Sequence, residues 1–311
     1  MVNDVVIVAA ARTPITKAIR GTFANVRAED LAIAAIAGAL DKVPAVDRAS
    51  IDDFITGSWM QAGSQSGNIA RRIAVMMGHD AVPGVTVNRA CASSLQAIRM
   101  AHHAIALGEA DVVVASGVES ISGYTEPTGA GSTPDHDRHP FFNQAAQRTR
   151  LAVGDNATWV DPRESGEHPD IYLAMGHTAE NVASLRGISR EEQDAFALRS
   201  QRLASQAIAE GFFAREIVPV TVGDDSVLSD ESVRSETTAE GLASLKPVFR
   251  PQGTITAGNC CPLSDGAAAV VVMSKEKAES LGLSWLAEIG AHGVVAGPDA
   301  SLQEQPANAI I

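Results

Sequence analysis

The sequence is poor in aromatic residues and in positive charge, and it has no long apolar run. Phe, Trp and Tyr make up 4% of its 311 residues, which disfavours a surface that stacks nucleic-acid bases. The net charge of −13 also disfavours a nucleic-acid partner, which requires Lys and Arg to neutralise phosphates. No apolar stretch approaches the ~20 residues that span a bilayer, and the N-terminus lacks the basic segment of a signal peptide. We therefore expect neither a nucleic-acid nor a membrane partner.

Cysteine is also scarce, and the three cysteines are Cys91, Cys260 and Cys261. An odd number with two adjacent residues argues against a disulfide framework and predicts a reducing, cytoplasmic location. No paired C-x-x-C motif is present, so a structural zinc site is not expected. His136 and His139 resemble a metal-binding pair only superficially, because no third ligand follows at a suitable spacing. We expect no metal site.

Apolar and polar segments alternate along the first 120 residues as strands and helices do. Predicted strands cover 4–10, 52–59, 84–88 and 110–117, and predicted helices cover 28–43, 67–78 and 92–108. This alternation predicts an α/β protein with a mixed or parallel sheet and helices on both faces.

A long segment of different character follows, rich in Gly, Pro, Asp, His and Thr over residues 121–170. We interpret it as loop. Ser189 and Glu192 have the spacing of a helix capping box. Further predicted elements are helices at 175–187, 189–211 and 275–282, strands at 216–222, 266–274 and 286–295, and an irregular stretch at 223–245. Residues 121–245 therefore read as an insertion into an α/β core.

Cys91 lies between a short β-branched strand and a helix rich in small residues. The positive end of a helix dipole stabilises a thiolate there, and nearby backbone N–H groups can donate to an oxyanion. The alternative is a small apolar residue packed at a turn, because free cysteine is usually buried. From these residues alone, packing is the favoured interpretation.

Several motifs favour a catalytic Cys91 over a packed one. The stretch VNRACASSLQAI (87–98) resembles the nucleophile motif of the thiolase family. Other matches follow the family's order: VAAARTPI (8–15), SGVESIS (116–122), MGHTAENVA (175–183), SLKPVF (244–249) and TAGNCCPLSDGAAAVVVMS (256–274). The resemblance covers essentially the whole chain.

The resemblance implies a thiolase-like layered αβαβα fold with an inserted loop domain. Residues 1–120 and 246–283 would form the N-terminal core, 121–245 the inserted CoA-binding loop domain, and 284–311 the start of a C-terminal domain. Members of the family are usually homodimers or homotetramers, which we expect for the full-length form.

The resemblance also implies an acyl-CoA C-acyltransferase that cleaves a 3-ketoacyl-CoA, or condenses two acyl-CoA molecules, through an acyl group on Cys91. Coenzyme A and acyl-CoA are then substrates, and no cofactor is permanently bound. Six residues match the family's CoA contacts: Met175, Arg234, Leu245, Phe249, Ala257 and Cys261. For each apolar position taken alone, ordinary core packing is the alternative.

The sequence departs from the family at Ala174, at Cys261-Pro262, where the family often has Ser then Gly, and in the absence of three motifs. Ala174 stands where acetoacetyl-CoA thiolases tend to have histidine, which favours a degradative enzyme with broader or longer acyl substrates. The family's Asn-Glu-Ala-Phe, Gly-His-Pro and Cys-x-Gly-Gly-Gly motifs are absent from these 311 residues. A helical pattern that starts at Pro306 stops at once. We therefore expect a truncated thiolase with impaired turnover, and exposed apolar surface on residues 270–273 and 286–295.

Two other functions remain open from the sequence. The first is a non-catalytic acyl-CoA-binding or interaction protein that a partner chain completes. The second is a related condensing enzyme that uses a carrier protein, which the CoA-loop motifs disfavour.

Overall fold

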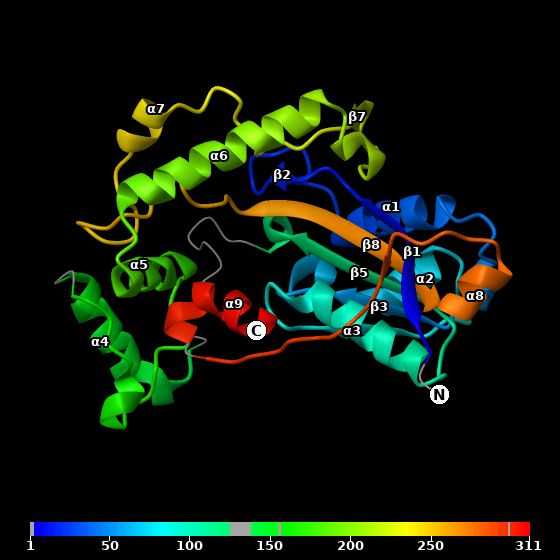
Figure 1. Cartoon of the computed structure of the whole chain (residues 1–311), viewed down its shortest axis with the longest axis horizontal. Helices are drawn as coiled ribbons and strands as arrows, with labels where there is room; N and C mark the ends of the chain where they lie inside the picture. Colours follow the sequence, from blue (N-terminus) through cyan, green and yellow to red (C-terminus); the bar gives the residue numbers. More distant parts are fainter. Residues whose placement is uncertain (1–2, 125–137, 155–156, 298) are drawn as a thin grey trace. The chain divides into compact units, whose positions relative to one another are not determined.

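The structure is a computed structural model that describes residues 3–124, 138–154, 157–297 and 299–311 (Figure 1). The chain forms two compact units. The first comprises residues 1–124, 208–232 and 263–291, and the second comprises residues 125–207, 233–262 and 292–311. His136 lies outside the described residues.

The first unit is built on a mixed sheet whose strand order is β4-β3-β5-β8-β1-β9 over the described residues, with β2 also paired to β8. Strand β3 is parallel to β4 and β5, whereas β8 is antiparallel to β5 and β1. The strands are β1 (Val5–Arg12), β2 (Thr16–Lys17), β3 (Asp53–Gly57), β4 (Gly84–Val87), β5 (Val112–Ser120), β8 (Ser264–Ser274) and β9 (Ala287–Glu288). The predicted strands at 4–10, 52–59, 84–88, 110–117 and 266–274 are confirmed.

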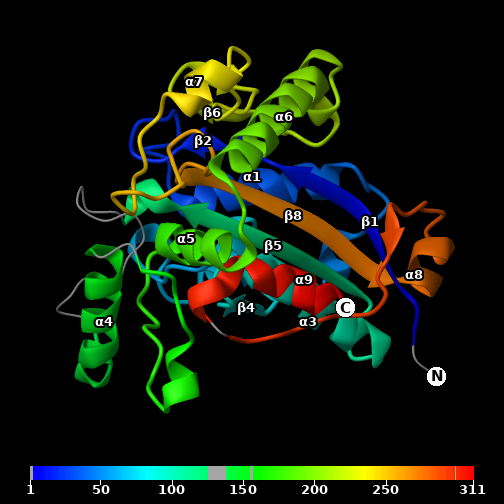
Figure 2. The same ribbon diagram turned by 60° about the vertical axis from the view of Figure 1, so that its left-hand side comes forward.

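Helices cover both faces of this sheet, as Figures 1 and 2 show. The helices of the first unit are α1 (Ala28–Asp41), α2 (Ile69–Met76), α3 (Ser93–Ala106) and α8 (Lys275–Ser280). Successive side chains of a strand point to opposite faces, so Val112 and Val114 of β5 pack on the side of α1, and Val113 on the side of α3. Burying each such side chain contributes roughly 1.5–3 kcal/mol. The predicted α/β class with helices on both faces is confirmed.

Strand β8 lies in the middle of the sheet between β5 and β1. Its residues Val271, Val272 and Met273 are fully buried. The expectation of exposed apolar surface is therefore wrong for Val271, Val272 and Met273, because α1 and α3 already cover both faces of this strand. It is confirmed for residues 286–295, where Leu286, Val294 and Val295 are exposed.

Residues 208–232 return to the first unit and are held on β1 by Arg12. The Arg12 guanidinium donates to both carboxylate oxygens of Asp230, at 2.8 and 3.0 Å, and to Glu216 Oε1 at 2.7 Å. It also lies 5.3 Å from the ring centroid of Phe213. These contacts explain why a segment so far along the chain packs beside the first strand.

Two strand predictions need correction. In place of a strand over 216–222 there is a two-stranded hairpin, β6 (Val220–Val222) with β7 (Asp225–Val227). The strand predicted over 286–295 reduces to β9, which pairs with Val6 and Ile7. Beyond β9 the chain contains Gly290 and Gly293, which weaken a strand because they have no side chain to pack.

The second unit contains α4 (Asn143–Gly154), α5 (Met175–Arg186), most of α6 (Arg190–Ala209), α7 (Ala239–Ala243) and α9 (Gln305–Ile310). The predicted helices at 175–187 and 189–211 are confirmed. So is the capping box: Ser189 N donates to Glu192 Oε2 at 2.8 Å, and Glu192 N donates to Ser189 Oγ at 3.1 Å. Pro306 lies in the first turn of α9, as its pattern predicts.

The interpretation of 121–170 as loop is wrong for α4. Its sequence, NQAAQRTRLAVG, consists largely of good helix formers, and Ala145 and Ala146 are buried. Neighbouring Gly and Pro residues concealed this local propensity. The irregular interpretation of 223–245 is likewise incomplete, because β7 and α7 lie there.

The compact units and the predicted domains divide the chain differently. Residues 208–232, part of the predicted insertion, lie in the first unit, whereas 246–262, part of the predicted core, lie in the second. The domain boundaries stay a prediction, since a compact unit need not coincide with a family domain. Among the described residues, no helix has both the length and the apolar character needed to cross a membrane.

Candidate active site

Cys91 sits on a short turn between the end of β4 and the start of α3. The preceding residue, Ala90, has φ of 47°, a left-handed conformation that non-glycine residues seldom adopt. Side chains hold this turn: Ala90 N donates to Asn88 Oδ1 at 2.9 Å, and Arg89 N donates to Ser93 Oγ at 2.8 Å. Ser93 Oγ in turn donates to Ala90 O at 2.6 Å. A strained backbone held by several contacts is a feature that recurs at functional sites.

Two glycines bring the start of α3 close to the sheet. A Cβ atom on Gly57, the last residue of β3, would overlap the backbone of Ser93 and Ser94. A Cβ atom on Gly117 of β5 would lie 2.6 Å from Ser94 Cβ. The sheet and the first turn of the helix therefore pack at backbone distance, which fixes the turn that carries Cys91.

A chain of hydrogen bonds extends this support to Glu119 in β5. The Glu119 carboxylate accepts from Trp59 N at 2.8 Å and from Met60 N at 3.2 Å. Trp59 O accepts from Asn88 Nδ2 at 2.5 Å. Asn88 thus links the Glu119 cluster to the Cys91 turn, a role that the sequence pattern did not reveal.

The Cys91 residue is exposed and forms no disulfide. Exposure disfavours the alternative in which it is a core residue packed at a turn. The arrangement presents a thiol beside the N-terminus of a 14-residue helix, with small neighbours on either side. Such a thiol is accessible to an electrophile of the size of a thioester.

The six residues matched to CoA contacts all lie in the second unit, whereas Cys91 lies in the first. Met175 is 49% exposed and Leu245 37% exposed, so neither is a core residue. The Phe249 ring packs directly on Gly176, the residue after Met175, where a Cβ would overlap it. Met175 and Phe249 therefore lie close to each other in the structure.

A second group of these residues lies close together in the same unit and consists of Arg234, Leu245 and Ala257. Arg234 Nη1 donates to Ala257 O at 3.4 Å. Gly258 allows the Leu245 side chain to approach, since a Cβ there would lie 2.6 Å from Leu245 Cδ1. An exposed arginine beside apolar surface suits a ligand with both phosphate and apolar parts.

Cys260 and Cys261 follow on the same strip, and both residues are exposed and free. Although Cys260 reaches the surface, the atoms packed around its thiol raise its pKa. The neighbouring Cys261 adds to this rise, and the charge of Arg234 opposes it. The pKa shift makes Cys260 a weaker nucleophile at neutral pH than an unperturbed thiol.

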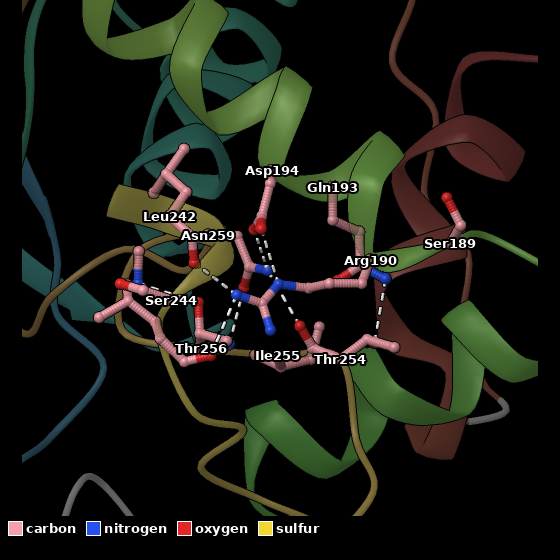
Figure 3. Close-up of polar contacts among 12 residues, drawn as sticks. Ser189, Arg190, Gln193, Asp194, Leu242, Ser244, Thr254, Ile255, Thr256 and Asn259 are labelled. Atoms are coloured by element: carbon pink, nitrogen blue, oxygen red, sulfur yellow. Dashed lines mark hydrogen bonds and ion pairs between the residues drawn. The ribbon is translucent and has the colours of Figure 1, made fainter. Parts of the chain in front are cut away.

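A polar network holds the loops that carry Leu245 and Ala257 (Figure 3). Arg190 donates to Asp194 Oδ2 at 2.8 Å and to the carbonyl oxygens of Leu242 and Leu245 at 2.6 and 3.1 Å. Asn259 Nδ2 donates to the other Asp194 oxygen at 3.0 Å. Arg190 and Asp194 are four residues apart on α6, a spacing that the sequence displays, but their partners are distant in the chain.

His139, one of the two histidines considered for metal binding, has a local structural role. Its Nδ1 accepts a hydrogen bond from Phe141 N at 3.2 Å and so caps the short 3₁₀ helix Pro140–Phe142.

The chain matches the thiolase N-terminal domain over residues 5–276. It is 43% identical to a probable acetyl-CoA acetyltransferase of Mycobacterium leprae, a match that covers 98% of this chain and 75% of the relative. The chain therefore belongs to the thiolase family, and the predicted family resemblance is confirmed.

Solved structures agree. The crystal structure of the Bacillus anthracis acetyl-CoA acetyltransferase superimposes with a TM-score of 0.82 at 36% identity, and covers 99% of this chain and 75% of that one. Human mitochondrial 3-ketoacyl-CoA thiolase in complex with CoA gives a TM-score of 0.81 at 31% identity, with 99% and 74% covered. The predicted thiolase-like α/β fold is confirmed, and the chain spans about three quarters of these relatives.

Proposed function

We propose that the protein is a thiolase-type acyltransferase in which Cys91 accepts the acyl group. The Cys91 thiolate attacks the carbonyl carbon of an acyl-CoA, a bond forms between sulfur and that carbon, and CoA leaves as its thiolate. In the cleavage direction the thiolate attacks the 3-keto carbon of a 3-ketoacyl-CoA, and the bond between the α- and β-carbons breaks. The acyl group stays on the Cys91 sulfur, and the acetyl-CoA enolate leaves and takes up a proton. The observation that carries this proposal is an exposed cysteine on a constrained strand-to-helix turn, inside the segment that matches the family.

The geometry of the turn supports an oxyanion site at Cys91. We assign its own backbone N–H to the developing negative charge on the carbonyl oxygen, because a preorganised donor there stabilises the transition state more than the ground state. The hydrogen bonds of Asn88 and Ser93 hold the turn before substrate binds.

Coenzyme A is the proposed partner of Met175, Arg234, Leu245, Phe249, Ala257 and Cys261. The exposure of Met175 and Leu245 supports this, since exposed apolar side chains are available to a pantetheine arm or an adenine ring. The solved human relative contains CoA. No permanently bound cofactor is required for the chemistry.

We further propose a preference for acyl chains longer than acetoacetyl, in the degradative direction. Ala174, the residue before α5, has a smaller side chain than the histidine that acetoacetyl-CoA thiolases tend to have there. A cytoplasmic location and assembly of the full-length form as a homodimer or homotetramer remain part of this proposal.

These 311 residues do not contain the histidine and second cysteine that the family uses for proton transfer. A protein made of these residues alone is therefore expected to form the acyl-enzyme slowly and to turn over little. The same reasoning keeps one alternative in view, a non-catalytic protein that binds acyl-CoA.

The test is acylation of the 311-residue protein by acetyl-CoA and by a longer acyl-CoA, followed by intact mass and peptide mapping. We expect one acyl group on Cys91 in the wild-type protein and in the matched variant Cys260→Ala, and none in Cys91→Ala. Acylation that persists in Cys91→Ala contradicts the assignment. Binding of CoA without acylation of any cysteine would favour the non-catalytic alternative.

A further inference from the structure

A cavity of about 290 Å³ lies within the second unit, lined by α4, α5 and the segment 158–173. Its walls are mainly apolar and include Val153, Trp159 and Leu173. Pockets for small molecules are usually apolar with a few converging polar groups, and ~300 Å³ is near the lower end of their range. The size therefore suits a short ligand.

Arg250 supplies a positive charge at this cavity although the residue is only 8% exposed. One of its Nη atoms donates to the carboxamide oxygen of Asn181, whose Nδ2 donates to Ala300 O at 2.8 Å. Arg250 Nε has no hydrogen-bond acceptor among the described residues. A buried guanidinium with an unused donor is costly, because burial removes its hydration without a replacement.

The carboxylate of Glu180 acts on Arg250 through its charge and not through a hydrogen bond. Burial lowers the pKa of Arg250 against the opposing effect of Glu180. The Glu180 carboxylate is already occupied, since it accepts hydrogen bonds from Thr254 N and Ile255 N at 2.9 Å each. Arg250, which lines the cavity, therefore keeps a donor that no acceptor of the described residues takes up.

The other polar groups of the lining are mostly paired with each other or with groups nearby. Glu167 pairs with Arg148 at 3.3 Å, and Asp161 pairs with Arg163, which lies outside the lining, at 2.6 Å. Asp170 accepts from Tyr172 N at 3.1 Å.

His177 adds a second open position, because its buried Nδ1 has no partner among the described residues. Burial and the charge of Arg250 lower the pKa of His177, while Glu180 and Asp170 oppose the shift. The imidazole is therefore neutral near neutral pH and able to donate to an oxygen.

We propose that this cavity binds a carboxylate on a short apolar body, with the carboxylate on Arg250 and the body against Val153, Trp159 and Leu173. A planar guanidinium matches the geometry of a carboxylate, and a charge-assisted bond of this kind is stronger than a neutral one. The carboxylate has two possible sources, a free short-chain acid or the far end of a dicarboxylic acyl group carried by CoA.

The second source of the carboxylate, an acyl group carried by CoA, rests on the proposed function. The His177 ring stands edge-on to Phe249 with 5.7 Å between centroids, and Phe249 is one of the proposed CoA contacts. The cavity therefore adjoins the proposed path of the acyl-CoA within the second unit.

The first experiment compares hexanoate with hexanamide by isothermal titration of the 311-residue protein. The two ligands have similar shape and differ in charge. We expect saturable binding of hexanoate, about tenfold tighter than hexanamide, since a hydrogen bond to a charged group exceeds a neutral one by about that factor. Equal affinity for both ligands, or no saturable binding of hexanoate, overturns the proposal.

Variants locate the site. Arg250→Met should weaken hexanoate binding about tenfold and remove the preference for the acid. The control Arg186→Met removes an exposed arginine of the same unit, paired with Glu304, and should leave the affinity unchanged.

A second variant is needed because loss of a buried arginine can unfold a protein. Ala152→Leu fills the cavity and should cause the same loss of hexanoate affinity. Full hexanoate affinity in either Arg250→Met or Ala152→Leu places the ligand elsewhere and refutes the proposal.

A final comparison separates the two sources by isothermal titration of the 311-residue protein with adipyl-CoA and hexanoyl-CoA. Tighter binding of adipyl-CoA that Arg250→Met abolishes identifies the acyl group as the source of the carboxylate. Equal affinities of the two thioesters together with tight hexanoate binding identify a free acid. If acyl-CoA leaves Cys91 unmodified in the acylation test, the proposed function fails, whereas the hexanoate measurements still decide whether the cavity binds a carboxylate.

Discussion

The two compact units are stabilised by different means. In the first, the hydrogen bonds between strands and two apolar clusters on the faces of the sheet fix the backbone. The turn that carries Cys91 packs closely on that sheet because Gly57 and Gly117 have no side chain. In the second, polar side chains bond to the backbone of distant loops, as Arg190 and Asp194 do. The difference teaches that the proposed nucleophile depends on close packing, whereas the proposed CoA loops depend on a few charged and amide groups.

The strongest way to break the first arrangement is Gly57→Ala. The added Cβ would overlap the backbone of Ser93 and Ser94, which cannot move aside like a side chain. We expect the free energy of unfolding to fall by about 3 kcal/mol or more, in the range of overpacking at a rigid contact. Urea denaturation measures this loss.

Gly290→Ala is the matched control, since nothing lies within 4 Å of a Cβ at that exposed glycine of the same unit. A change within about 0.5 kcal/mol is expected there. Equal stability of the two variants would show that the helix start is not packed as described.

The second arrangement is tested by Asp194→Ala. The variant leaves Arg190, whose side chain is 19% exposed, without its carboxylate. It also removes one of the two acceptors of Asn259 Nδ2, the other being Thr254 O. Loss of one partner of a largely buried pair should lower the free energy of unfolding by about 2–3 kcal/mol. CoA binding, followed by calorimetry, should weaken as the Leu245 loop loosens.

For comparison, Asp41→Ala removes an ion pair with Arg48 in which both side chains are well exposed. Such a pair contributes about 0.5 kcal/mol or less. If the Asp194 variant loses no more stability than the Asp41 variant, the polar network does not hold the second unit.

The smallest expected changes in the free energy of unfolding come from one histidine in each unit, His79 and His177. Burial lowers the pKa of both, with a further contribution from Arg48 at His79 and from Arg250 at His177. Below about pH 6.5 the unfolded chain takes up protons that the folded chain resists, so stability falls as the pH falls.

Urea denaturation at about pH 7.5 and 5.5 tests this. His79→Gln and His177→Gln should each show a smaller loss of stability over that interval than the wild-type protein. A loss of unchanged size in either variant would show that the histidine concerned does not resist protonation in the folded state.

Sequence reasoning succeeded where structure is dictated locally. The alternation of apolar runs predicted β1, β3, β5 and β8 and the helices between them, and the Ser189–Glu192 spacing predicted a cap that the structure contains. The ordered motifs predicted the family, which the comparisons confirm.

Sequence reasoning failed where the contacting residues are distant in the chain. Glu119, Trp59 and Asn88 support the Cys91 turn from three separate segments, and no local pattern joins them. Arg250 is buried beside Asn181, although arginine is mostly exposed in proteins. Which residues contact CoA stays a prediction, because it rests on motif position alone.

The order of the strands in the sheet also governs how the protein folds. Strand β8 lies between β1 and β5, yet it is made of residues 264–274, long after both neighbours. At ~5–20 residues per second, a ribosome completes β8 on the order of ten seconds or more after β1. Until then the inner edges of β1 and β5 lack their common partner, and nascent chains with unpaired apolar strands are prone to aggregate. Closing contacts so distant in sequence also slows folding, so refolding from denaturant should be slow and should benefit from low protein concentration.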